Sequence, residues 1–217
     1  TGRRADALAS LGEEVARDGG RCHGVSMEVT DPASVQAGFD EAAALAGRAP
    51  DILVNNAGVA LTRAAIDMTP QEWSGVVDTN LTGAFTVAQA AARGMRAAGG
   101  GSIVNVASIL GLRVAGMVAP YAASKAGLIQ LTKALALEWA RDGIRVNALA
   151  PGYVETELNR AFFESEPGQR LIKRIPQRRL GRPEDLDGPL LLLCSDASAY
   201  MTGSVVEVDG GHLVSSL

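Results

Sequence analysis

The feature that most constrains the fold is a series of short runs rich in Val, Ile and Leu, which alternate along the chain with helix-like segments. Such near-continuous apolar runs are typical of strands that are buried on both faces of a parallel sheet. With approximate bounds, the predicted strands are Arg21–Met27, Asp51–Asn55, Ser102–Ala107, Ile144–Leu149 and Ser204–Val208. Because strands and helices alternate, the sequence predicts an α/β fold with a parallel sheet.

Helical segments fill the intervals between these strands. The main predicted helices are Ala33–Gly47, a shorter one that starts after Thr69, the alanine-rich segment Asp78–Ala98, and Tyr121–Arg141. Two of them begin with a capping side chain followed by proline, at Asp31 and at Thr69, which is a typical helix start.

The chain is expected to form one domain. Its 217 residues are enough for a single sizeable core, and no linker marks a second domain within residues 1–217. The polar stretch from Arg160 to Pro183 interrupts the alternation and contains Pro167, Gly168 and Pro176. We interpret it as an excursion over a binding site.

Composition excludes several classes of protein. A formal net charge of −4 disfavours nucleic-acid binding. No apolar run approaches the about 18 residues of a membrane span, so no membrane association is expected. Cys22 and Cys194 are isolated, which fits a reducing cytoplasm. His23 and His212 lie far apart, so no metal site is expected.

A tyrosine and a lysine provide the first candidate for chemistry. Tyr121 and Lys125 are four residues apart on a predicted helix and therefore share one face. An ammonium group near a phenol lowers the pKa of the phenol, which would let tyrosine exchange a proton near neutral pH. On this pair alone, a surface tyrosine and a solvated lysine remain the alternative, because the spacing is a loose pattern.

Polar residues at strand ends and within one helix strengthen this interpretation. Ser108 ends a predicted strand, at the edge where parallel α/β sheets bind ligands. Asn80 lies inside a predicted helix, where asparagine is a mediocre helix former, so we expect a buried polar role such as holding a water. The alternatives are a strand-end cap for Ser108 and a solvent-facing side chain for Asn80.

Taken together, these motifs resemble the short-chain dehydrogenase/reductase family in its single-domain form. Six features match in order along nearly the whole chain. They are the turn Asn55–Gly58, Asn80, Ser108, the Tyr121/Lys125 pair, the turn Pro151–Gly152, and the C-terminal stretch SDASAYMTGSVVEVDGG. The resemblance implies a Rossmann-like, doubly wound parallel sheet in three layers.

The resemblance also assigns a reaction and its catalytic residues. It implies that Tyr121 donates or removes a proton while a ketone and a secondary alcohol interconvert by hydride transfer. Ser108 would hold the reacting oxygen, and Lys125 would lower the pKa of Tyr121 and bind the nicotinamide ribose. Asn80 would hold a water that links Lys125 to solvent.

Further positions are implied to bind the nicotinamide cofactor or to cover the substrate. By resemblance, the cofactor contacts include Asn56, Ala57, Gly58, Tyr121, Lys125, Pro151, Gly152, Val154 and Thr156. Residues 155–182 would form a substrate lid. Glu28 stands where the family often has aspartate against the adenine, which puts that contact in question, whereas Val29 can still pack on the adenine.

One family element is missing from the sequence. The glycine-rich turn TGxxxGxG, which lets a pyrophosphate approach a helix N-terminus, does not occur. By resemblance, the chain starts at the end of the family's second strand, and strand three and the interior strands would have bare edges. We therefore expect roughly 30–40 further residues upstream, the size of one βαβ unit. An intact mass would test this expectation.

The start of the chain bears on the choice of cofactor. By resemblance, Gly2 occupies the position at which an acidic residue binds the ribose of NAD, and Arg3 and Arg4 follow it. Guanidinium groups suit a 2′-phosphate, so NADP(H) is favoured over NAD(H). The alternative is that the arginines cap the adjoining helix.

The function that follows is an NADP(H)-dependent oxidoreductase. Its substrate is expected to be a 3-oxoacyl thioester, which a carrier protein could hold, or a sugar or polyol. A basic patch made of Arg174, Arg178, Arg179 and Arg182 would favour the acidic carrier protein. The alternative function is a catalytically silent dinucleotide-binding or sensing protein, and an enoyl reductase is disfavoured because those relatives space tyrosine and lysine differently. The resemblance further implies a homotetramer.

Overall fold

Four parallel strands form the central sheet of the structure, a computed structural model that describes residues 1–157 and 159–215. The strands lie side by side in the order β1-β2-β3-β4. Their bounds are β1 Ile52–Asn55, β2 Gly101–Val106, β3 Ile144–Pro151 and β4 Val205–Val208. Each lies within about two residues of its predicted bounds, so these four strand predictions are confirmed.

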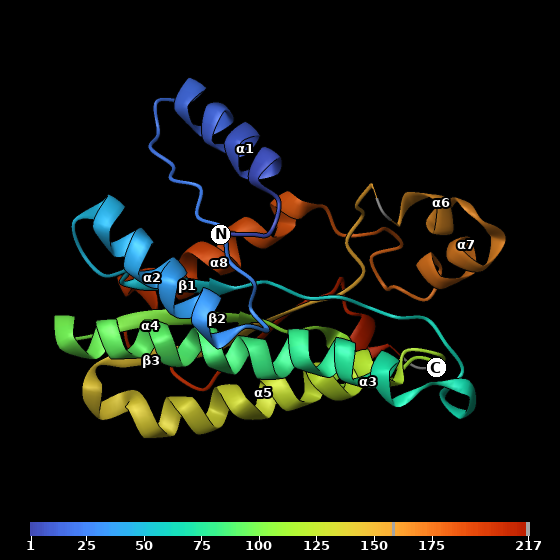
Figure 1. Cartoon of the computed structure of the whole chain (residues 1–217). Helices are drawn as coiled ribbons and strands as arrows, with labels where there is room; N and C mark the ends of the chain where they lie inside the picture. The colour runs from blue at the N-terminus through green and yellow to red at the C-terminus, as the bar shows by residue number, and fades with distance from the viewer. Residues whose placement is uncertain (158, 216–217) are drawn as a thin grey trace.

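Helices cover both faces of the sheet (Figure 1). The α-helices are α1 Ala5–Arg17, α2 Pro32–Ala46, α3 Pro70–Val77, α4 Ala84–Ala98, α5 Ala119–Trp139, α6 Arg160–Glu164, α7 Glu166–Ile172 and α8 Asp187–Cys194. Helices α4 and α5 pack on one face, and α8 packs on strands β2 and β3 from the other. This arrangement confirms the predicted three-layer α/β fold with a parallel sheet.

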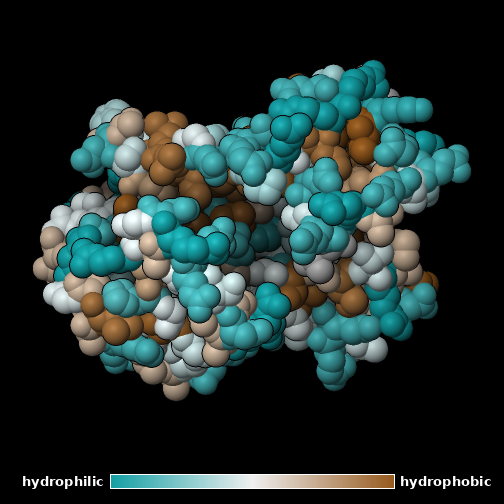
Figure 2. All heavy atoms as spheres, turned by 90° about the horizontal axis from the view of Figure 1, so that it is seen from above, coloured by the Kyte–Doolittle hydropathy of each residue, from teal (hydrophilic) through white to brown (hydrophobic). Residues whose placement is uncertain are grey.

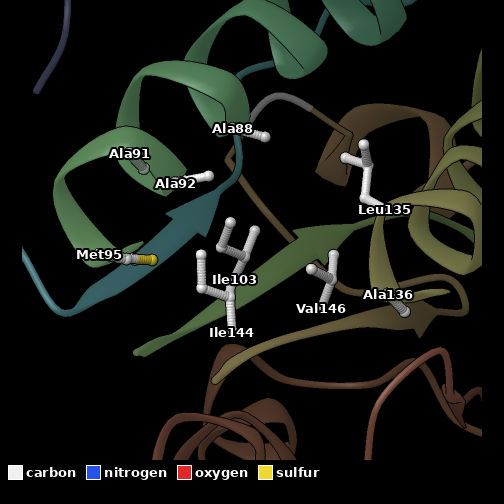
Figure 3. Close-up of a cluster of buried hydrophobic side chains, with 9 residues drawn as sticks. All are labelled: Ala88, Ala91, Ala92, Met95, Ile103, Leu135, Ala136, Ile144 and Val146. Carbon is white, nitrogen blue, oxygen red and sulfur yellow. The ribbon is translucent and has the colours of Figure 1, made fainter. Parts of the chain in front are cut away.

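The largest core cluster lies between the sheet and the helices α4 and α5. Ile103, Ile144 and Val146 project from β2 and β3 into the space between Met95 of α4 and Ala136 of α5, as Figure 3 shows. Alanines at positions 88, 91 and 92 let α4 approach the sheet closely. On the other face, Leu193 of α8 is fully buried.

Side-chain caps start the helices where the sequence predicts. The Asp31 carboxylate accepts a hydrogen bond from the Ala33 backbone N–H at 2.9 Å, and proline follows as the first residue of α2. Thr69 and Glu72 form a reciprocal capping box at the start of α3. The chain then stays helical from α3 into α4 through a π-helical segment, Asp78–Gly83, where a regular α-helix is predicted.

The predicted strand Arg21–Met27 is wrong. The only pairing in this segment is an isolated parallel bridge between Gly2 and Ser26. Gly2 donates its N–H to the Val25 carbonyl at 3.3 Å and accepts from the Met27 N–H at 3.0 Å. A strand exists only through ladder bonds to a neighbour, and a single neighbouring residue cannot supply a ladder. Strand β1 likewise has β2 as its only partner among the described residues.

The segment that interrupts the strand–helix alternation folds into helices α6 and α7 beside the sheet's carboxyl edge (Figure 1). A short backbone connection fixes its two ends, because Gly181 donates its N–H to the Tyr153 carbonyl and Glu155 donates to the Gly181 carbonyl, both at 2.9 Å. Its role as a lid, residues 155–182, stays a prediction. Within the described ranges, no helix combines the length and apolarity needed to cross a membrane.

Candidate active site

The carboxyl ends of three strands and one helix meet around a single cavity of about 260 Å³. Its walls come from the turns after β1, β2 and β3 and from α5. They are Asn56, Gly58, Val59, Ala60, Val106, Ala107, Ser108, Tyr121, Lys125, Pro151 and Gly152. The structure therefore brings together three of the four predicted catalytic residues and several predicted cofactor contacts.

Lys125 is held rigidly in this cavity. The residue is only 4% exposed, and its Nζ donates a hydrogen bond to the Val106 carbonyl at 2.7 Å. Nζ also lies 5.7 Å from the centre of the Tyr121 ring. Burial lowers the pKa of Lys125 to about 8. The solvated-lysine alternative is therefore wrong.

Tyr121 behaves differently from the expectation. Burial raises its pKa, and the Ser108 side chain, which reaches toward the phenol, acts in the opposite direction. Burial outweighs the other influences on this pKa, and its lowering by Lys125 stays a prediction. In this structure the hydrogen bond of Lys125 Nζ goes to the carbonyl of Val106.

Ser108 has the capping role considered for it, and its role at a substrate oxygen stays a prediction. Its backbone is extended and its side chain is buried at the end of β2. Its hydroxyl accepts a hydrogen bond from the Leu110 N–H at 3.1 Å, which caps the 3₁₀ turn Ile109–Gly111. The hydroxyl hydrogen remains free to point toward an oxygen in the cavity beside Tyr121.

The Asn80 side chain connects two elements of the site through hydrogen bonds. It is 0% exposed within the π-helical segment, so the solvent-facing alternative is wrong. Its Oδ1 accepts from the Val59 N–H at 2.8 Å, and its Nδ2 donates to the Val59 carbonyl at 2.9 Å and to the Ser124 hydroxyl at 3.1 Å. The side-chain amide thus joins the turn after β1 to helix α5, and its role in holding a water stays a prediction.

Two residues that contribute to the site were not predicted from the sequence. The Val106 carbonyl holds Lys125, but a backbone atom leaves no residue-type signal. Gly111 packs against α5 so closely that a Cβ there would lie 2.7 Å from the carbonyl carbon of Lys125. The only available signal was a glycine three residues after the candidate serine.

A second cavity, of about 370 Å³, extends from the first toward the start of the chain. The two share Asn56, Gly58 and Val59, so they form one continuous cleft. The second cavity also brings together the predicted cofactor contacts Gly2, Arg3, Glu28, Val29 and Ala57. Seen from above, Figure 2 shows a hollow between the two raised sides of the molecule.

Arg3 and Glu28 form an ion pair in this part of the cleft. Arg3 Nη1 lies 3.4 Å from Glu28 Oε2, and Thr30 donates its N–H and its hydroxyl to Glu28 Oε1 at 3.1 and 2.9 Å. These Thr30 hydrogen bonds are the main reason that the pKa of Glu28 is lowered, and Arg3 adds to the effect. The family resemblance left the contact of Glu28 with an adenine in question, and its pairing with Arg3 was not predicted.

Three predicted cofactor contacts lie outside these two cavities. Arg4 is the N-cap residue of α1, but its side chain makes no capping hydrogen bond. Val154 forms an isolated bridge with Gly181, and the Thr156 N–H donates to the Asn159 side chain at 2.8 Å. Whether Arg4, Val154 and Thr156 reach a bound cofactor stays a prediction.

The cleft fits an elongated nucleotide cofactor. Gly58 lines both cavities, and a Cβ there would stand at ordinary contact distances of 3.4 Å from Asn80 Oδ1 and 3.6 Å from Lys125 Nζ. One end carries cationic Arg3, and the other carries Ser108, Tyr121 and Lys125. No group of three or more His, Cys, Asp or Glu residues suited to a metal occurs in the described part of the chain.

A three-layer parallel fold with this cleft at its carboxyl edge is the Rossmann-like arrangement in which dinucleotides bind. A family model described as Enoyl-(Acyl carrier protein) reductase matches residues 2–212. A D-threitol dehydrogenase of Mycolicibacterium smegmatis is 38% identical over 97% of this chain and 80% of its own. A 3-oxoacyl-[acyl-carrier-protein] reductase of Aquifex aeolicus is 39% identical over 97% of this chain and 84% of its own.

A solved structure agrees in fold. The gluconate 5-dehydrogenase of Burkholderia cenocepacia, crystallised with NADP and tartrate, has a TM-score of 0.94 and 39% identity over 99% of this chain and 84% of its own. The chain belongs to the short-chain dehydrogenase/reductase family, and it is an oxidoreductase that acts on CH–OH or carbonyl groups.

Proposed function

We propose that this protein is an NADP(H)-dependent oxidoreductase that interconverts a small ketone and a secondary alcohol. The observation that carries the proposal is the meeting of Ser108, Tyr121 and Lys125 in one cavity that opens into the cleft of Arg3. When bound in this cleft, the nicotinamide supplies or accepts the hydride.

Each side chain then has a defined task at the reacting oxygen. The Ser108 hydroxyl donates a hydrogen bond to this oxygen and polarises it. The Tyr121 hydroxyl donates its proton as the oxygen gains charge, and in the reverse direction it accepts the proton. Its raised pKa keeps the phenol protonated before reduction. The Lys125 ammonium stabilises negative charge that develops on Tyr121 and offers its remaining hydrogens to a ribose hydroxyl.

Asn80 acts on this centre through position. By clamping Val59 and Ser124 it fixes the turn after β1 against helix α5, the two elements between which the reaction takes place. The proposed proton path from Lys125 to solvent through a water held near Asn80 uses the same junction.

Arg3 supports NADP(H) over NAD(H). Its side chain is 72% exposed at the cleft wall, and its guanidinium can exchange the partner Glu28 for a 2′-phosphate. Gly2 leaves no carboxylate at the position that would bind a ribose 2′-hydroxyl. The Burkholderia cenocepacia relative was solved with NADP, which is consistent with this choice.

A small substrate is favoured over an acyl chain delivered by a carrier protein. Arg179 of the candidate docking patch is already paired with Asp185 through two contacts of 2.6 and 3.2 Å. Asp185 also accepts from the Arg182 backbone N–H at 2.7 Å, so this carboxylate is committed to the loop. We also propose a homotetramer and a cytoplasmic location for the protein.

The direct test is NADPH consumption by the purified full chain with a panel of ketoses, keto acids and acetoacetyl-CoA. The proposal expects turnover with at least one small ketone, and faster turnover with NADPH than with NADH. NADPH binding without turnover on any substrate would indicate a dinucleotide-binding protein instead.

A further inference from the structure

Beyond the catalytic cavity, three residues from distant parts of the chain form a polar cluster. Arg113 follows the Ser108 turn, and its Nη1 donates to the His212 carbonyl at 2.6 Å. The His212 ring lies 5.5 Å, centre to centre, from the ring of Tyr153. Tyr153 directly follows Gly152, a wall of the catalytic cavity. The cluster therefore adjoins the site of the proposed reaction.

Tyr153 links the cluster to the catalytic tyrosine. Its ring is fixed between His212 and Phe163 of α6, whose centre lies 5.9 Å away at an angle of 74°. Burial raises the pKa of Tyr153, the charge of Arg113 lowers it, and Tyr121 raises it further. The hydroxyl thus lies within electrostatic range of both the guanidinium and the catalytic phenol.

His212 carries an unsatisfied polar atom in this cluster. The residue is 5% exposed, and its Nδ1 has no hydrogen-bond partner among the described residues. Leaving a buried polar atom unpaired costs about 1–3 kcal/mol, so such an atom calls for a partner. A hydroxyl group of a bound molecule can either donate a hydrogen bond to His212 Nδ1 or accept one from it.

The fixed charges around the cluster favour an anion. Arg113 has one Nη bound to a carbonyl, which leaves its charge uncompensated by any carboxylate among its described contacts. The nearby carboxylate of Asp209 is occupied by the backbone N–H groups of Gly211 and Leu213 at 2.8 and 2.6 Å. Arg174 adds a second positive charge within range of His212.

We propose that Arg113 and Tyr153 recognise a carboxylate of the substrate, which makes the substrate a hydroxy or keto acid of the sugar-acid type. The guanidinium fork suits a planar carboxylate, the Tyr153 hydroxyl donates to the same group, and His212 Nδ1 pairs with a substrate hydroxyl. This inference rests on the proposed function, because it names the substrate class of the same site. A neutral polyol or a long acyl chain would leave Arg113 without a counter-charge.

The test compares Arg113→Gln with the unmodified chain on two ketones of equal length, 5-keto-D-gluconate and D-fructose, with NADPH. The proposal expects kcat/KM for the acid to fall by roughly 10- to 150-fold, as when a charged hydrogen-bond partner is lost. For the neutral ketose it expects a change within about threefold, in line with unaltered neutral contacts. Arg48→Gln, which removes the same charge from the surface just before β1, serves as the matched control and leaves both values unchanged.

A binding measurement keeps this test independent of turnover. Calorimetry with D-gluconate is expected to show binding to the unmodified chain, weaker binding to Arg113→Gln, and unchanged binding to Arg48→Gln. Equal binding by all three proteins, or no binding to the unmodified chain, overturns the carboxylate site. Turnover of D-fructose with intact NADPH binding would then leave the proposed function standing. Loss of all turnover together with Arg113-dependent gluconate binding would leave the carboxylate site standing and contradict the proposed function.

Discussion

At the scale of single residues, the site depends on burial more than on charge pairing. Lys125 is almost completely enclosed, and the Val106 carbonyl is its only hydrogen-bond partner among the described residues. Desolvation therefore dominates and lowers the pKa of the ammonium to about 8, and it also raises the pKa of Tyr121. A sequence pattern shows that the two side chains share a helix face, but it cannot show how deeply they lie.

The buried Lys125 predicts a pH dependence of stability. Its pKa is about 8 in the folded chain and about 10.4 when unfolded, so between these values the unfolded chain binds more protons. The free energy of unfolding should therefore rise with pH in this window, by up to about 1.4 kcal/mol per pH unit from this group. Urea unfolding at pH 7.5 and 9.5 measures the gain, and Lys125→Met should lack it. Identical pH dependence in both proteins would contradict the assignment.

Arg3 and Glu28 predict how the cofactor is chosen. Arg3→Ala should weaken NADPH binding by about tenfold, the loss expected for one charged phosphate contact, and leave NADH binding nearly unchanged. Glu28→Gln removes the carboxylate that competes for Arg3 and should strengthen NADPH binding alone. Fluorescence titration with both nucleotides measures these effects. An equal loss for both nucleotides in Arg3→Ala would show that Arg3 does not read the 2′-phosphate.

At the scale of elements, local sequence patterns were sufficient to predict the strands and helix starts that depend on nearby residues alone. Apolar runs placed β1 to β4 within about two residues, and the caps at Asp31 and Thr69 marked the starts of α2 and α3. The segment Arg21–Met27 has the same apolar character, yet a strand also needs a partner, and Gly2 is its only bridge partner. Whether such an apolar segment becomes a strand therefore depends on a pairing partner that is distant in sequence, which composition does not reveal.

For Asn80, the burial could be predicted from the sequence, whereas its long-range contacts could not. A mid-helix asparagine indicated a buried polar role, which the structure confirms. Its partner Val59 lies in the turn after β1 and Ser124 lies on α5, and no local pattern connects these three residues. Asn80 lies in a π-helical segment, and such segments occur often at functional sites.

The contact between the turn after Ser108 and helix α5 predicts a sharp effect at Gly111. A Cβ there would meet the Lys125 carbonyl carbon at 2.7 Å and its oxygen at 2.8 Å, and neither backbone atom can move without the helix. Gly111→Ala should therefore lower the free energy of unfolding by about 1–3 kcal/mol and reduce turnover by displacing Tyr121. Urea unfolding and NADPH oxidation measure both effects.

A glycine in the same loop provides the control for that prediction. A Cβ at Gly116 would have no neighbour within 4 Å, so Gly116→Ala should change the free energy of unfolding by less than about 0.5 kcal/mol. Similar losses in the two variants would mean that loop flexibility, rather than the contact of Gly111 with α5, determines the result.

At the scale of the whole molecule, the fold serves to bring strand ends together. Parallel strands place the turns after β1, β2 and β3 on one edge of the sheet (Figure 1). The cleft at this edge connects Arg3 with Tyr121. The family resemblance predicted this architecture, and a TM-score of 0.94 to a solved relative confirms it. The substrate could not be predicted, because residues such as Arg113 and His212 meet only in the folded chain.

Exposed apolar side chains on the outer helices predict the assembly state. Phe85 of α4 and Leu137 of α5 are both exposed on the layer that packs against one face of the sheet. Burial of such side chains against other copies would support the proposed homotetramer. Light scattering should then give four times the 22.4 kDa chain mass at micromolar concentration. The mass of a single chain would contradict this assembly.

The central claim is that Tyr121 transfers the proton while the adjoining cleft binds NADPH. The most direct measurement is turnover together with NADPH binding in Tyr121→Phe, which removes only the hydroxyl. Turnover should fall by at least about 100-fold, the contribution of a general acid, while the Kd for NADPH stays within about twofold. A Tyr121→Phe protein that binds NADPH and reduces its substrate at the rate of the unmodified chain would contradict the account.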